Sequence, residues 1–136
     1  MTSLLAIKIR LARFLRELAG RQFCMGRQDC GLMLADWCLA EIGIDPASEI
    51  RGRYNTTDEA MCLLGVSSLP MVFGRLCRAA GIPLTTRPRY GDIAMIELGG
   101  SVRGAIRTSG YVVLGESAGI SRVAAARLVA AWSVHA

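Results

Sequence analysis

Cys30 is the residue whose type and position could do chemistry. It follows Asp29, a residue type that often caps helices, and an apolar helical pattern runs from the cysteine to Ile42, just before Gly43. A thiol in the first turn of a helix faces free backbone N–H groups and the positive end of the helix dipole, which favour the thiolate. The position meets the physical requirement for a cysteine nucleophile with a lowered pKa, but a cysteine near a helix start is more often a small buried hydrophobic residue.

A cysteine nucleophile also needs a base within hydrogen-bond reach of its sulfur. The only histidine is His135, far along the chain from Cys30. Asp92 and Glu116 are carboxylates that could accept a proton, but Asp92 lies between a glycine and an apolar run, where a side chain often anchors a turn. We therefore expect His135 to lie away from Cys30 and Asp92 to hold the turn before a strand.

The five cysteines do not form a metal-binding pattern. Cys24, Cys30 and Cys38 lack both a Cys-x-x-Cys pair and a neighbouring histidine, which zinc sites usually contain. Their odd number, and first residues without the positive charge of a signal peptide, favour reduced thiols. We expect no metal and no cofactor.

Composition indicates one globular domain over residues 1–136. Hydrophobic residues make up 52% of the 136 residues and charged residues 20%, which allows a core without disulfides or metal. The net charge is +5, but the arginines are spread along the chain without an aromatic platform, so we expect no nucleic-acid partner. No apolar run reaches 18 residues, the approximate minimum for a spanning helix, so we expect no stable membrane insertion.

Helical patterns occupy the first part of the chain. Residues 3–19 place apolar residues on one stripe and most basic residues elsewhere, and Gly20 supplies a stop. This basic amphipathic helix fits docking on its own domain, on a partner subunit or on a membrane surface. Further helices are expected at 30–42, at 57–64 and at 70–80.

Short apolar runs separated by glycine follow from about residue 87 and predict strands. Gly99-Gly100 marks a hairpin. The expected strand segments are 92–98, 102–108, 110–114, 119–123 and, before the chain ends, 126–134. Helices followed by a small antiparallel sheet indicate an α+β domain.

Two segments resemble landmarks of the NlpC-type, papain-like cysteine peptidases. Phe23-Cys-Met-Gly-Arg-Gln-Asp-Cys-Gly-Leu is similar to the segment in which an aromatic residue and a glycine precede the Asp-Cys pair that opens the catalytic helix. Tyr90-Gly-Asp-Ile-Ala-Met-Ile is similar to that superfamily's Gly-Asp strand, which leads into the strand carrying the histidine. The resemblance implies a papain-like fold with Cys30 in the nucleophile position. Near the expected histidine, however, this chain has Gly104.

Six short motifs, spread over about residues 10–134, also resemble small tail-associated proteins of siphophages and prophages. They are Asp29-Cys30, Ala35-Asp36-Trp37, Gly43-Ile-Asp-Pro, Arg51-Gly-Arg-Tyr, Gly91-Asp92 and Ala131-Trp132. This resemblance implies a tail-tip or tail-assembly protein, made in the bacterial host cytoplasm and carried in the virion tail. Its partners would be other tail proteins, such as hub or distal tail components.

Two functional hypotheses follow. The first is a structural tail protein on a degenerate cysteine-peptidase scaffold, which contacts partners through its basic first helix and arginine-rich loops. The alternative is a cysteine endopeptidase or amidase that acts on cell-wall peptides of peptidoglycan, with Cys30 as nucleophile and a base supplied unconventionally or by a neighbouring subunit. Each missing acid–base function costs roughly two to four orders of magnitude in rate, so the absent histidine favours the first hypothesis.

Overall fold

The computed structural model describes residues 3–21, 24–26, 28–114 and 119–135. Over these residues the helices come first: α1 (Leu4–Leu18), α2 (Cys30–Ile42), α3 (Thr57–Leu64) and α4 (Leu69–Ala80). The strands follow: β1 (Ile93–Leu98), β2 (Ser101–Arg107), β3 (Tyr111–Leu114), β4 (Ile120–Val123) and β5 (Arg127–Trp132). This order confirms the predicted α+β class, with helices first and a small antiparallel sheet after them.

Local capping explains where the helices begin and end. The side chains of Ser3, Asp29, Thr56 and Ser68 each accept a backbone N–H from the first turn of the helix that follows. α2 ends at Gly43, which has a φ of 71°, a left-handed conformation that glycine adopts without strain. The predicted helix boundaries therefore agree with the structure to within one or two residues.

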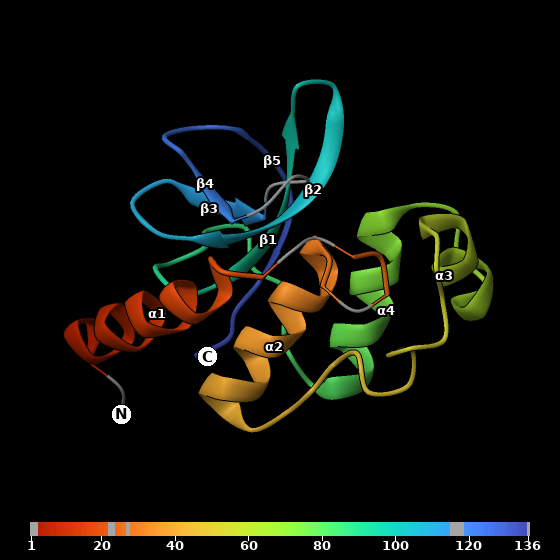
Figure 1. Cartoon of the computed structure of the whole chain (residues 1–136), viewed down its shortest axis with the longest axis horizontal. Coiled ribbons are helices and arrows are strands. Elements are labelled where there is room, and N and C mark those ends of the chain that lie inside the picture. Colours follow the sequence, from red (N-terminus) through yellow and green to blue (C-terminus); the bar gives the residue numbers. More distant parts are fainter. Residues whose placement is uncertain (1–2, 22–23, 27, 115–118, 136) are drawn as a thin grey trace.

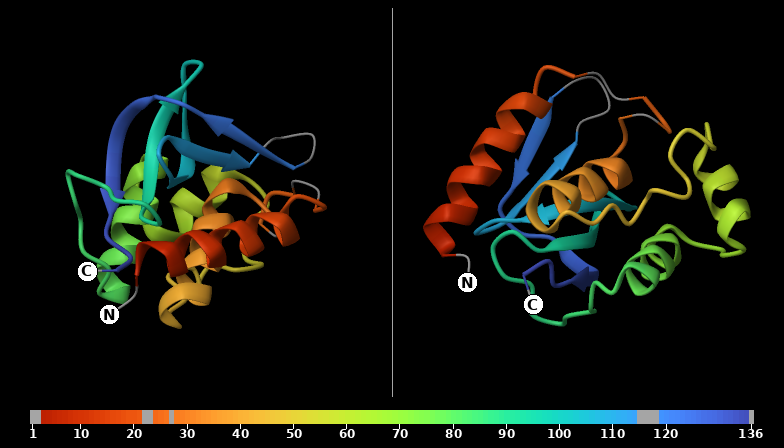
Figure 2. Two further views of the ribbon diagram at one scale, coloured as in Figure 1. Left: turned by 90° about the vertical axis from the view of Figure 1, so that its left-hand side faces the viewer. Right: turned by 90° about the horizontal axis from the view of Figure 1, so that it is seen from below.

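The strands form one antiparallel sheet in the order β4-β3-β2-β1-β5. β1 lies between β2 and β5, with Met95 opposite Gly104 and Ile93 opposite Trp132. The helices cover one face of this sheet (Figure 1). α2 crosses the middle of that face, α1 runs along one side of it, and α3 and α4 lie on the other side (Figure 2).

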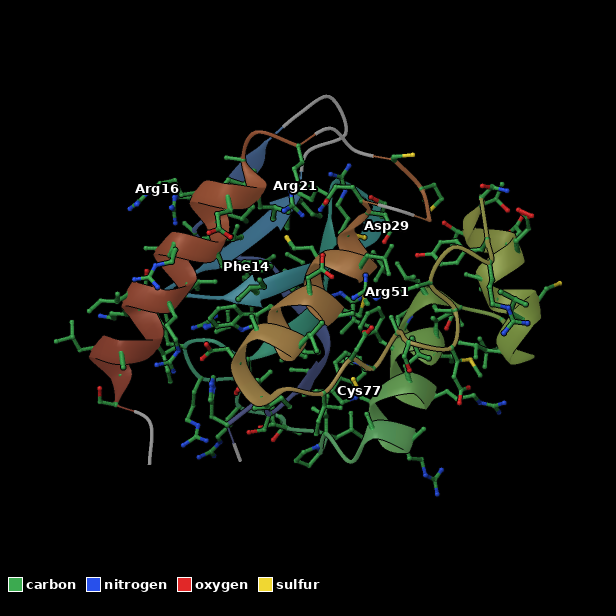
Figure 3. The ribbon with its side chains drawn as sticks, turned by 60° about the horizontal axis from the view of Figure 1, so that its bottom comes forward. Phe14, Arg16, Arg21, Asp29, Arg51 and Cys77 are labelled. Atoms are coloured by element: carbon green, nitrogen blue, oxygen red, sulfur yellow. The ribbon has the colours of Figure 1, made fainter. Side chains whose placement is uncertain are left out.

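The first helix docks on its own chain. Its apolar stripe of Ile7, Leu11, Leu15 and Leu18 is buried in the main core, and the Phe14 ring lies 5.4 Å from the Trp37 ring of α2. Figure 3 shows Phe14 between the two helices and Arg16 directed away from both. The sequence left this helix free to dock on its own domain, on a partner subunit or on a membrane surface. In the structure it docks on its own domain.

Two cores stabilise the fold. The main core lies between the helices and the sheet, and its largest fully buried side chains include Trp37 and Trp132. A smaller core on the opposite face of the sheet contains Tyr111. Val123 from β4 and Leu128 from β5 both pack against this smaller core. Because β4 and β5 are the two edges of the sheet, the sheet must curl around it.

Among the described residues, no single helix has both the length and the hydropathy needed to cross a membrane. Taken together, α3 and α4 have this length and hydropathy, but the two helices are bent by 46° at the break between them. Val72, Phe73 and Leu76 of α4 are buried in the main core.

Candidate functional site

Cys30 lies at the point where α2 meets both the sheet and α4. It is the first residue of the helix, and its side chain is partly buried. It lines a small pocket of about 50 Å³. The other walls are mostly apolar and come from α2, α4 and the loop between α2 and α3; they include Leu32, Ala47, Ile50, Tyr54, Leu69, Val72 and Phe73.

This environment disfavours the thiolate form of Cys30. Burial raises the pKa of the Cys30 thiol above its ordinary value, and the neighbouring Asp29 carboxylate adds to that rise. Backbone hydrogen bonds from Gly104 and Gly31 and the charge of Arg103 act in the opposite direction without offsetting the burial. The lowered pKa that a helix N-terminus favours is therefore not found, because desolvation by the surrounding apolar side chains outweighs it. The environment agrees with the alternative of a small buried hydrophobic residue.

The strand beside Cys30 leaves little space for a side chain at position 104. β2 packs against the first turn of α2 at Gly104, where a Cβ atom would lie 3.0 Å from the Cys30 carbonyl oxygen and 3.0 Å from Leu34 Cδ1. The resemblance to peptidases puts the histidine near this position. Here a side chain at residue 104 would push against the helix that carries the thiol.

His135 lies at the opposite end of α2. Its Nε2 atom is 2.8 Å from Oε1 of Glu41. Glu41 follows Cys30 by eleven positions in the same helix, which corresponds to about 16 Å along the axis. This confirms that His135 lies away from Cys30 and cannot take its proton.

Glu41 is the centre of a buried cluster that the sequence did not reveal. Arg10 donates from Nε to Oε2 of Glu41 at 2.6 Å and from a terminal nitrogen to Oε1 at 3.0 Å. The Glu41 side chain is only 1% exposed. Burial alone would raise its pKa, but hydrogen bonds from Arg10 and His135 outweigh burial and leave this pKa lowered. Through these hydrogen bonds, Glu41 connects α2 to α1 and to the segment after β5.

Asp92 holds the turn before β1, as predicted. Its Oδ2 accepts the backbone N–H of Arg89 at 2.8 Å, and its Oδ1 accepts that of Val134 at 3.0 Å. Both carboxylate oxygens are therefore engaged, and Asp92 is a structural residue. Glu116, the other candidate proton acceptor, lies outside the described residues.

Asp29 does more than cap α2. It is 3% exposed, and its carboxylate accepts the N–H of Leu32 at 2.8 Å, the N–H of Gly26 at 2.9 Å and the hydroxyl of Tyr54 at 2.6 Å. Burial, together with the bond to Asp29, raises the pKa of Tyr54. Asp29 thus ties the start of α2 to the segment before it and to the loop before α3.

The motifs singled out in the sequence contact one another across the fold. Arg51 forms ion pairs with Asp36 at 2.6 Å and with Asp45 at 2.7 Å. Trp37 Nε1 donates to the carbonyl oxygen of Gly91 at 2.8 Å. Figure 3 shows Arg51 beside the first half of α2, with Asp29 at the start of that helix. With the bond between Asp29 and Tyr54, these contacts connect five of the six motifs through α2. Residues of these five motifs therefore have a structural role.

The described cysteines and acids form no metal centre. Among the described residues, no group of three or more His, Cys, Asp or Glu side chains could hold a metal ion. Cys24 and Cys62 are exposed free thiols, whereas Cys38 and Cys77 are buried free thiols. Burial raises the pKa of Cys38 to about 12 and raises that of Cys77 as well.

Comparison with known proteins identifies a family. No curated protein and no solved structure matches this chain, so the likeness to NlpC-type peptidases and to phage tail proteins stays a prediction. The profile of one family, described as a domain of unknown function (DUF6950), matches residues 4–134. Because that match covers nearly the whole chain, this protein belongs to the DUF6950 family.

Proposed function

We propose that this chain is a structural protein of a phage or prophage tail, built on a cysteine-peptidase-like scaffold that lacks catalytic power. The environment of Cys30 is the observation that carries the proposal. The resemblance to peptidases implies that this thiol is in the nucleophile position, but burial raises its pKa. The chain's only histidine is bound to Glu41 at the other end of α2.

Hydrolysis of an amide would need two things from this site. The attack requires a thiolate, and departure of the amine requires a proton donor near the sulfur. The raised pKa of Cys30 disfavours the first. Gly104, beside the thiol, has no side chain to supply the second. A site of this kind supports retention of a scaffold better than catalysis.

Two features support a role in assembly. The six motifs resemble those of small tail-associated proteins, and residues of five of them connect the fold through α2. The outward face of α1 also offers contact surface, because Leu5 and Ile9 are 67% and 52% exposed and lie beside the exposed Arg13 and Arg16. Partners would be hub or distal tail proteins, with assembly in the bacterial cytoplasm and a final place in the virion tail.

The reactivity of Cys30 tests the catalytic part of the proposal. In a variant with both exposed thiols removed (Cys24→Ser, Cys62→Ser), Cys30 is the most accessible cysteine. We expect slow alkylation by iodoacetamide that rises only above the pH range of an ordinary thiol, and no digestion of peptidoglycan. A companion variant that keeps Cys62 and carries Cys30→Ala supplies the rate of an exposed thiol. Fast alkylation of Cys30 below pH 7 with Cys30-dependent digestion would favour the cysteine hydrolase instead.

Genetic complementation tests the assembly part. In the phage or prophage that encodes this chain, deletion of its gene should give particles with missing or incomplete tails in electron micrographs. Both the wild-type gene and the Cys30→Ala gene should restore normal tails. Normal tails after deletion would contradict the proposal, and so would rescue by the wild type alone.

A further inference from the structure

The outward face of α1 is apolar in its first half and positively charged in its second half. Leu5 and Ile9 are 67% and 52% exposed, and the exposed Arg13 and Arg16 follow on the same stripe of the helix. Neither arginine forms an ion pair with a described residue. Glu17 is the only acidic residue of α1, so the second half keeps a net positive charge. The stripe therefore runs from apolar to positive along the helix.

The outward face of α3 carries the complementary groups in the reverse order. The exposed Asp58 and Glu59 lie in its first turn. Cys62 and Leu63 follow one turn later on the same side, and both are exposed. Neither carboxylate forms an ion pair within the described part of the chain, and Glu59 accepts only the backbone N–H of Asn55, at 3.0 Å. This stripe therefore runs from negative to apolar along the helix.

The basic side chains near α3 are directed to other groups. Arg53 donates to the carbonyl oxygen of Glu49 at 2.8 Å. Arg75 donates to the carbonyl oxygen of Leu64 at 2.8 Å. Because Leu64 is the last residue of α3, Arg75 lies at the apolar end of the stripe and not at its acidic end. The first turn of α3 therefore keeps its negative charge for a partner.

The two faces match when the helices lie antiparallel. The arginine half of α1 is then beside the acidic turn of α3, and Leu5 and Ile9 are beside Leu63. Four positions separate Ile9 from Arg13. Four also separate Glu59 from Leu63, so the charged and apolar groups of each helix are about 6 Å apart along its axis. Since α1 and α3 lie on opposite sides of α2 (Figure 1 and Figure 2), one chain cannot bring its own two faces together.

We propose that the outward face of α1 binds the outward face of α3 in a second copy of this chain. Ion pairs between the arginines and the two acids lie beside an apolar contact of Leu5 and Ile9 with Leu63. Because the two faces differ, the contact is heterologous, and its repetition builds a closed ring or a filament. The inference goes beyond the proposed tail function. It is tested on the purified protein alone, so either proposal can fail without the other.

Charge-swapped variants provide the test. In sedimentation experiments the average mass of the wild type should rise with protein concentration and fall with added salt, because salt screens exposed ion pairs. One variant, Arg13→Glu with Arg16→Glu, has two acidic faces. A second variant, Asp58→Lys with Glu59→Lys, has two basic faces. Each variant alone should associate at least about tenfold more weakly than the wild type, because like charges then meet at the contact.

An equimolar mixture of the two variants should recover association, because every acidic face then meets a basic one. The control Arg78→Glu, Arg87→Glu reverses two exposed arginines outside both faces and should associate like the wild type. Urea unfolding verifies that each variant folds. A wild type that stays monomeric at millimolar concentration, wild-type association of either swapped variant alone, an equal loss in the control, or a mixture that does not recover would overturn the proposal. A monomeric wild type that binds anionic phosphatidylglycerol vesicles through the arginines of α1 would overturn it in favour of a membrane.

Discussion

Asp29→Ala should destabilise the protein more than the loss of an ordinary helix cap. Removal of an N-cap costs about 1 kcal/mol. The substitution also leaves the Gly26 N–H and the Tyr54 hydroxyl without a hydrogen-bond acceptor in a buried setting, because Asp29 accepts both of them. Each unsatisfied buried donor costs about 1–3 kcal/mol, so the total loss is roughly 3–7 kcal/mol. The whole unfolding free energy of a typical domain is only about 5–15 kcal/mol.

Urea unfolding followed by tryptophan fluorescence measures this loss, because Trp37 and Trp132 are both buried. Asp29→Asn keeps one carbonyl oxygen and should cost less. Tyr54→Phe removes the hydroxyl that Asp29→Ala leaves unsatisfied. The double variant Asp29→Ala, Tyr54→Phe should therefore lose about 1–2 kcal/mol less unfolding free energy than the two single variants lose together. Additivity within about 0.5 kcal/mol would refute the reasoning, since it would mean that the two side chains are not coupled.

Three further predictions concern charge and space. The pKa of Cys38 in the folded state is raised to about 12. The buried thiol therefore contributes stability that is fully present below its unfolded pKa of about 8.5 and is lost as pH rises toward the folded pKa. In urea titrations at alkaline pH, Cys38→Ala should reduce the slope of the unfolding free energy against pH by about 1.4 kcal/mol per pH unit. The lowered pKa of Glu41 contributes stability above its unfolded pKa that is lost as pH falls, so Glu41→Gln should flatten the acid side of the same profile, and an unchanged acid side would contradict the assignment. Gly104→His should lower the urea midpoint and confer no peptidoglycan digestion, because its Cβ would press on the Cys30 carbonyl; a gain of digestion would show that the helix can make room for a base.

Local signals predict the elements of this fold well. Caps such as Asp29 and stops such as Gly43 act within one turn of the helix, so the helix boundaries follow from neighbouring residues. The last strand shows the limit of such signals. An apolar run suggested strand over 126–134, but β5 ends at Trp132, because the chain beyond it turns to place the Val134 N–H on Asp92, 42 positions away.

The state of the candidate site depended on contacts that no spacing reveals. The position of Cys30 at a helix start was predictable, but the sign of its pKa shift was not. Phe73 and Ile50, which help to bury the thiol, come from α4 and from the loop after α2. The cluster around Glu41 was missed for a similar reason, since Arg10 and His135 lie 31 and 94 positions from it.

The position of β5 also constrains how the protein is made. The strand pairs with β1 and carries Trp132 into the main core, and His135 beyond it completes the cluster with Glu41. Until residues 127–135 leave the ribosome, the nascent chain can fold its helices and its first hairpins but must leave one edge of β1 and part of the core open. An unpaired strand beside exposed apolar side chains invites association with other chains. Synthesis of this protein therefore includes a period in which one edge of β1 is unpaired, and this period ends only when β5 emerges.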